Sequence, residues 1–264
     1  MSKVLLIASN TMRDALRQKL VYLMALAALV LTLFSSYIMK MDLGHEELKF
    51  VANFTSGALS FFGGIIAITS ICQLFYSELE NKTVATLMSK PINFAQFVGG
   101  KILGQSYMLF FFCLIIMLVG AASLVFAQYK LSLSPQEFLV GKREVIHWFG
   151  FASFGILQFF KLCVISSFAC FICTASRSMM FAIVVSFMAV SASLLNYSDF
   201  MSGEGWILKA CSYILPNLGI FEPSLSFTFG GFKCAEFFAA LAYAIIYIFV
   251  FGALSVWSFS KREI

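Results

Sequence analysis

The stretch WFGFASFGILQFFKLCVISSFACFICT, residues 148–174, decides the fold class because Lys161 is its only charged residue. A helix needs about 20 mainly apolar residues to cross about 30 Å of hydrocarbon. The stretch therefore predicts a membrane-spanning helix with one charge near its middle. Such a charge raises a functional hypothesis, although a lysine can also extend to the interface or pair with a carbonyl group or a neighbouring subunit.

Five further stretches meet the same length criterion, so the sequence predicts an all-α polytopic membrane protein with six transmembrane helices in one domain, residues 1–264. Apart from Lys161 these spans contain no charged residue, whereas 12% of the whole chain is charged. The predicted spans are residues 20–39, 53–76, 102–127, 148–174, 179–197 and 237–257.

The overall composition supports the same class. Hydrophobic residues make up 61% of the chain and the mean hydropathy is +0.91, whereas about a quarter of a soluble domain is charged. The net charge of +5 does not indicate nucleic-acid binding, because the basic residues lie at the ends of apolar stretches instead of forming one basic face. Membrane lipids are expected as partners, and nucleic acid is not.

The distribution of lysine and arginine predicts the orientation. With six spans, the side that holds both termini carries ten basic and four acidic residues, and the other side carries seven basic and nine acidic residues. Because basic residues favour the cytoplasmic side, both termini are expected in the cytoplasm. The predicted location is the bacterial cytoplasmic (inner) membrane.

Residues 77–101 form the largest predicted cytoplasmic segment. Asn81 can cap a helix start and Pro91 disfavours helical geometry at the residue before it, so a helix of about two turns is expected between them. Three apolar residues fall at helical spacing on it: Val84, Leu87 and Met88. This face can dock on a partner, or the helix can rest on its own bundle.

Residues 1–19 are predicted to form a basic amphipathic helix. The residues of its apolar stripe are Leu5, Ala8, Met12, Ala15 and Leu16. Such a helix lies along the membrane interface with its apolar side down. The alternative is a plain cytoplasmic extension of the first span.

The apolar stretch from Trp206 to Phe221 is interrupted by Lys209, Pro216 and Asn217 and is too short to cross the membrane. It predicts a re-entrant or interfacial element before the last helix, because irregular backbone at membrane depth needs protein or a watery cavity around it.

The sequence lacks the residues that several kinds of chemistry require. No GxxxxGK[ST] string occurs, so the chain is not expected to be an ATPase. The spans contain no carboxylate, which disfavours an intramembrane enzyme and an acid proton relay. The two histidines and the cysteine spacing predict no metal site and no cofactor on this chain.

The seven cysteines do not form a disulfide framework, because five lie inside predicted spans. Cys170 and Cys173 have CxxC spacing but lie in an apolar helix without further ligands. Cys211 and Cys234 are predicted on the outside, where they either pair or remain thiols.

The segment between spans two and three resembles the signature of ABC-2 type transporter permeases. The matching residues, in order, are Glu78, Glu80, Thr83, Leu87, Pro91, Ile92, Phe97, Gly100 and Lys101. The chain has Lys82 where the family usually has glycine, and Asn93 and Phe94 where an arginine is common. The resemblance is closest to the branch associated with copper-enzyme maturation.

The resemblance implies a six-helix permease subunit, homo- or heterodimeric, bound by separate ATP-binding cassette ATPase subunits that hold ATP and Mg. The loop between spans two and three would act as a coupling helix, and Lys101 would mark the cytoplasmic start of span three. The residues expected to carry coupling are Glu78, Glu80, Thr83, Leu87, Lys90 and Pro91.

The leading hypothesis is therefore an exporter-type permease subunit without its own ATPase activity. One alternative is a membrane scaffold or assembly subunit that transports nothing. A second alternative is a channel or secondary carrier, which would need a more polar pore lining than these spans offer.

Overall fold

The computed structural model describes residues 3–38, 47–80, 93–132, 146–194, 216–230 and 232–261. Within these ranges every regular element is helical, which confirms the all-α prediction. The elements are α1 (Lys3–Leu16), α2 (Lys19–Ile38), α3 (Glu47–Glu80), α5 (Phe94–Ser132), α6 (Trp148–Ala175), α7 (Met179–Leu194), the 3-10 helix η2 (Leu218–Leu225), α10 (Ser226–Gly230) and α11 (Cys234–Ser260).

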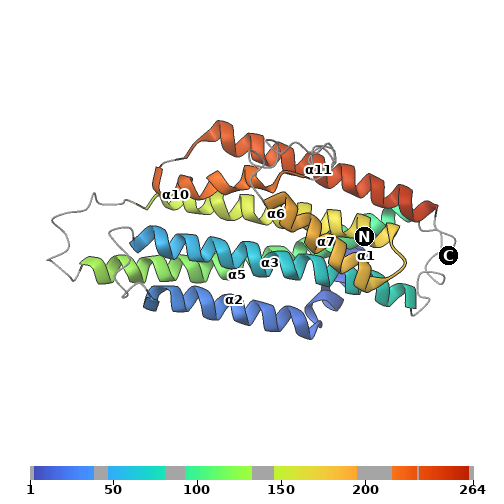
Figure 1. Ribbon diagram of the computed structural model, residues 1–264, viewed down its shortest axis with the longest axis horizontal. Helices are drawn as coiled ribbons and strands as arrows, with labels where there is room; N and C mark the ends of the chain where they lie inside the picture. The colour runs from blue at the N-terminus through green and yellow to red at the C-terminus, as the bar shows by residue number, and fades with distance from the viewer. Residues whose placement is uncertain are drawn as a thin grey trace.

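The long helices run roughly parallel in an elongated bundle (Figure 1). The two central helices are α3 and α6, in each of which 72% of the most apolar window is buried, against 17% in α11. Helix α3 contacts α2, α5 and α6, while α6 also contacts α11 and the η2–α10 segment. Apolar side chains of α3 and α6 therefore form the centre of the core.

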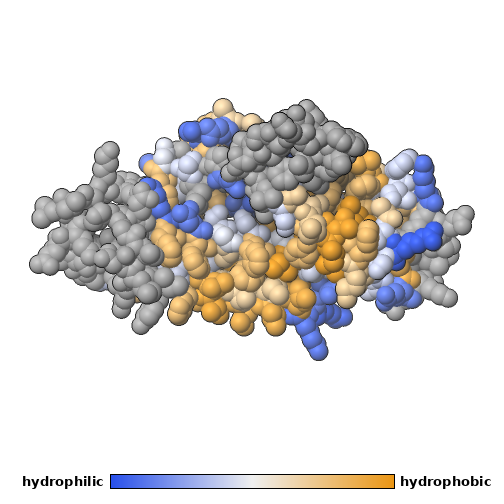
Figure 2. Space-filling view, viewed as in Figure 1, coloured by the Kyte–Doolittle hydropathy of each residue, from blue (hydrophilic) through white to orange (hydrophobic). Residues whose placement is uncertain are grey.

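The outward-facing side chains are largely apolar. Large hydrophobic residues are exposed on several helices, among them Leu26, Phe61, Met180 and Phe249. Figure 2 shows a broad hydrophobic surface over the middle of this face of the molecule. An apolar surface of this extent requires a lipid or protein cover, so the chain is a multi-pass membrane protein.

Helix length and composition give four or five candidate spans among the described residues. Four described helices, α3, α5, α6 and α11, are long and apolar enough to cross a membrane, and α1 with α2 forms a fifth candidate bent by 67°. Helix α7 has 16 residues, fewer than the roughly 20 that a span needs. The count of six therefore stays a prediction.

Helix α1 packs closely across the start of α5. Gly100 and Gly104 lie on the contact, and a Cβ atom at Gly104 would stand 2.6 Å from the carbonyl oxygen of Ala8. Ala8 and Ala15 of the predicted apolar stripe are buried, whereas Leu5 is 45% exposed. Small residues thus let two helix backbones approach; the position of α1 at a membrane interface stays a prediction.

The segment before α11 is broken, as its sequence predicts. Most of residues 206–221 lies outside the described residues, but the described end continues into η2 and α10, which pack on α6. The backbone N–H of His147 donates to the carbonyl of Thr228 (2.9 Å), and that of Asn217 donates to the Tyr243 hydroxyl (2.6 Å). Protein groups therefore satisfy this irregular backbone; its relation to the membrane stays a prediction.

The α1–α5 contact predicts that alanine substitutions at Gly104 and at Gly99 differ in their effect on stability. Gly104→Ala places a methyl group against the Ala8 carbonyl, which cannot rotate away, so we expect a loss of about 1–3 kcal/mol of stability and a lower Tm in detergent. The control is Gly99→Ala on the same helix, where no atom lies within 4 Å of the added Cβ. That variant should keep or gain stability, because alanine favours helix by about 1 kcal/mol. Equal Tm values for the two variants would contradict the described contact.

Candidate functional site

The candidate site is the end of the bundle at which α3 ends and α5 begins, called here the α3–α5 end. The predicted coupling loop joins these helices. Of the residues predicted to carry coupling, Glu78 and Glu80 lie in the last turn of α3. The other four lie outside the described residues: Thr83, Leu87, Lys90 and Pro91.

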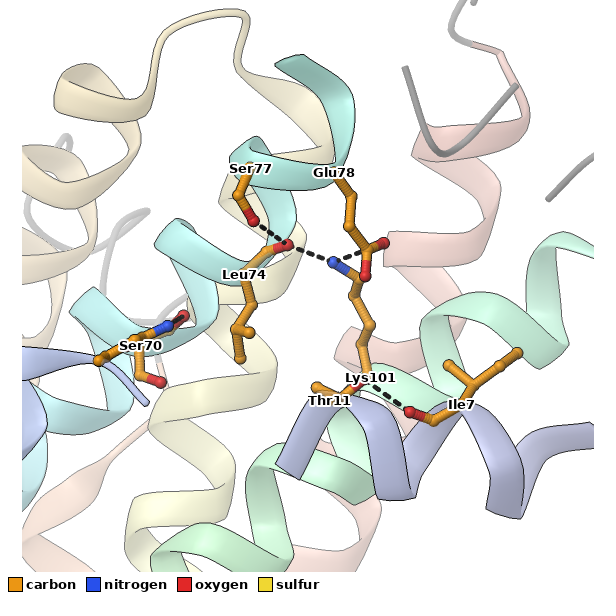
Figure 3. Close-up of polar contacts among 8 residues, drawn as sticks. Ile7, Thr11, Ser70, Leu74, Ser77, Glu78 and Lys101 are labelled. Atoms are coloured by element: carbon orange, nitrogen blue, oxygen red, sulfur yellow. Dashed lines mark hydrogen bonds and ion pairs between the residues drawn. The ribbon is translucent and has the colours of Figure 1, made fainter. Parts of the chain in front are cut away.

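A buried lysine joins the two helices at the base of this loop. Lys101, near the start of α5, has a fully buried side chain, and its Nζ lies 3.0 Å from Oε2 of Glu78. The same ammonium group donates to the carbonyl of Leu74 at 2.5 Å, and the hydroxyl of Ser77 also donates to that carbonyl at 3.3 Å (Figure 3). The last turns of α3 and the first turns of α5 are therefore tied together.

Aromatic rings surround the Lys101 ammonium group. Its Nζ lies 5.4 Å from the ring centroid of Phe75 and 5.2 Å from that of Phe97, within the range of cation–π attraction. Phe259, near the end of α11, packs on both rings at centroid distances of 5.5 and 5.6 Å. The end of α11 therefore meets α3 and α5 at the lysine.

Helix α6 is tied to the same part of α3. The Tyr76 hydroxyl donates to the carbonyl of Ser176 at 3.0 Å and lies 3.4 Å from that of Cys173. Carbonyl groups at a helix C-terminus lack partners within the helix, so Tyr76 supplies a partner for the end of α6. One stretch of α3, residues 74–78, thus contacts α5, α6 and α11.

Helix α1 packs on α5 at the same site. Gly100 precedes Lys101, and a Cβ atom there would lie 2.7 Å from Cγ2 of Ile7. Figure 3 shows Ile7 and Thr11 of α1 beside the backbone of α5 at Lys101. A displacement of the start of α5 therefore acts on α1 as well as on α3.

The structure separates the two acidic residues that the sequence grouped together. The Glu78 side chain is partly buried and its carboxylate pairs with Lys101, whereas Glu80 is exposed at the end of α3. Sequence analysis expected Lys101 only to mark the start of a span and missed its internal partner. The motif contained this signal, because it begins with the acidic Glu78 and ends with Lys101.

A second polar cluster lies deep in the bundle. Lys161 in α6 is 3% exposed, so the lone charge of this predicted span is buried. Its Nζ donates to Oγ of Ser60 on α3 at 3.3 Å, and that hydroxyl donates to Oε1 of Gln158 at 3.3 Å. Sequence analysis identified Lys161 but neither of its two neighbours.

The described residues contain no group of three or more histidine, cysteine or acidic side chains able to hold a metal ion. Cys72 and Cys173 are thiols whose sulfur atoms lie 3.1 Å apart between α3 and α6. Cys234 is an exposed thiol, and Cys211 lies outside the described residues, so their pairing stays a prediction.

Comparison with models of known protein families matches residues 5–264 to the model described as "ABC-2 family transporter protein". The chain belongs to the ABC-2 transporter family. Membrane proteins of this family are not ATPases themselves and typically pair with ATPase subunits. A search of curated proteins finds no match. The branch associated with copper-enzyme maturation stays a prediction.

The Lys101–Glu78 pair predicts a large loss of stability when Glu78 is replaced. Glu78→Gln leaves the Lys101 ammonium group buried without a counter-ion, which typically costs about 3–5 kcal/mol, so a markedly lower Tm is expected in detergent. Replacing both partners, with Lys101→Met added to Glu78→Gln, should restore part of that loss, because no buried charge remains.

The matched control is the Lys233–Glu236 pair, whose N–O distance is 2.9 Å but whose side chains are 61% and 47% exposed. Glu236→Gln should change stability by about 1 kcal/mol at most. If Glu78→Gln were as mild as Glu236→Gln, the assignment of Lys101 and Glu78 as a structural joint would be wrong.

Proposed function

We propose that this ABC-2 family protein is the permease subunit of an exporter-type ABC transporter and couples ATP turnover on a separate subunit to substrate movement. The observation that carries the proposal is the ion pair between the buried Lys101 and the partly buried Glu78. It fixes both ends of the expected coupling loop to the helices of the bundle. The exporter direction is taken from the resemblance of residues 78–101 to permeases of this kind.

A fixed loop base supports coupling for a mechanical reason. When an ATPase subunit moves a docked loop, that displacement changes the bundle only if the loop base is rigid. Here the base is held by an ion pair, a carbonyl contact and packed rings. Packed interfaces switch between discrete arrangements rather than deform smoothly, so movement of the loop would shift the bundle between two states.

The two acidic residues receive different roles in this proposal. Glu78 transmits force inside the permease because Lys101 engages its carboxylate. Glu80 is exposed and is assigned to the contact with the ATPase subunit. The residues expected beside it on the docking loop are Thr83, Leu87, Lys90 and Pro91.

The remaining assembly follows from the resemblance and the charge distribution. The loop and both termini are placed in the cytoplasm, and the chain in the bacterial cytoplasmic membrane. Two permease subunits, identical or different, would form the translocation unit. ATP and Mg would bind to the ATPase partners and not to this chain.

Affinity purification from the native host tests the partner. The tagged chain should copurify a separately encoded protein that carries a GxxxxGK[ST] motif, and ATP turnover by the reconstituted pair should exceed that of the ATPase alone. A partner without nucleotide-binding motifs would favour the scaffold alternative. Labelling of a cysteine introduced at residues 81–92 only from outside intact cells would contradict the docking geometry.

Charge reversal tests the role of Glu80. Glu80→Lys should weaken ATPase association at least about tenfold, because one repulsive contact at an interface costs on the order of 1.4 kcal/mol or more, and should leave Tm unchanged. The control is Glu236→Lys, an exposed acid outside the α3–α5 end, which should bind the ATPase like the wild type. Equal binding by both variants would remove Glu80 from the interface.

A further inference from the structure

The polar cluster around Lys161 differs from the Lys101 joint in how completely its charge is paired. Both lysines are buried. Lys101 has a carboxylate at 3.0 Å, a carbonyl at 2.5 Å and two aromatic rings. The Lys161 ammonium group has one hydrogen bond to a described residue, the 3.3 Å contact with Ser60.

An ammonium group has three donors, and burying an ion without a counter-ion is costly. No described carboxylate lies within the 4.0 Å ion-pair distance of Lys161 Nζ. Glu222, an exposed carboxylate, lies on η2, which packs against α6, and it attracts the Lys161 charge from a longer distance. Lys161 therefore has a counter-ion at a distance and retains donors that could bind a closer anion.

The position of Glu222 allows a bound anion to replace it as the partner of Lys161. Glu222 lies on η2, which packs against α6, but its carboxylate is not within the 4.0 Å ion-pair distance of Lys161. An anion that reaches Lys161 would replace a long-range attraction with direct, charge-assisted hydrogen bonds, which are the stronger kind. The Gln158 side chain, already linked through Ser60, adds an amide group to the same place.

The surroundings favour an anion that carries a hydrocarbon chain over a free inorganic ion. Ser60 is half-buried, and the adjacent Phe61 on α3 is 65% exposed. Gly57, one turn before Ser60 on the same side of α3, is also exposed. Ser60 therefore connects the buried Lys161 to the exposed side of α3, where the hydrocarbon chain of an amphipathic molecule can remain while its head group reaches Lys161.

We propose that Lys161, Ser60 and Gln158 bind the anionic head group, carboxylate or phosphate, of an amphipathic substrate, and that Glu222 is the counter-ion the substrate displaces. The assignment rests on the proposed transport function, because it names the class of molecule that the permease would move. It gives Lys161 a binding role rather than a purely structural one.

The test uses photoreactive probes on the purified protein in nanodiscs of zwitterionic phosphatidylcholine. One probe is a palmitic acid analogue with a diazirine near the carboxyl end, and its partner is the matching hexadecanol analogue. The wild type should be labelled by the acid at least about tenfold more than by the alcohol, with adducts on α3 and α6. Equal labelling by the two probes would overturn the proposal.

Four variants separate binding from folding. Lys161→Gln should abolish the preference for the acid and Lys161→Arg should keep it, because arginine retains the charge. Glu222→Gln should increase acid labelling by removing the competing carboxylate. The control Lys233→Gln, at an exposed lysine, should behave like the wild type. A preference that survives Lys161→Gln in a monodisperse sample, or unchanged labelling in Glu222→Gln, would refute the assignment.

Inorganic phosphate distinguishes the two sources of the anion. Added at millimolar concentration, it should not displace the acid probe, because it lacks the apolar chain. Displacement would mean a site for free anions and would overturn the amphiphile assignment. ATPase copurification with Lys161→Gln should be unchanged, so a failure of this inference is distinguishable from a failure of the proposed transport function.

Discussion

Burying an ammonium group is costly unless it is paired, and the pairing of Lys101 organises one end of the bundle. The lysine draws Glu78 and the Leu74 carbonyl toward the start of α5. Because Tyr76 and Phe75 lie between these two residues in sequence, the ends of α6 and α11 are held at the same point. The ends of three helices and the start of a fourth therefore meet at one set of contacts.

The two buried lysines show that burial alone does not define a role. Lys101 is enclosed by an acid, a carbonyl and rings, as expected of a structural joint. Lys161 is equally removed from solvent but has one hydrogen bond and a counter-ion beyond ion-pair distance. The difference lies in how many of the three ammonium donors the protein satisfies, and it is the basis of the different roles proposed for the two lysines.

The predictions from the sequence succeeded where one local property sufficed. The absence of charge over some 20 residues required apolar surroundings, so helices α2, α3, α5, α6 and α11 overlap the predicted spans closely. The amphipathic stripe at the N-terminus predicted helix α1 but not the surface on which it packs. That surface includes Gly100 and Gly104 of α5, which are distant from α1 in the sequence. The packing of η2, which carries Glu222, on α6 is likewise not visible in any local pattern.

By itself, the sequence determined that the chain is a helical membrane protein, where most of its helices lie and that it resembles ABC-2 permeases, since hydropathy, charge and a local motif are all written along the chain. Only the tertiary structure decided which side chains meet. Glu78 and Lys101 are separated by 22 residues, and Ser60 and Lys161 by 100. Pairing across such distances depends on how helices pack, and the packing arises from the combined fit of many apolar surfaces rather than from any one segment.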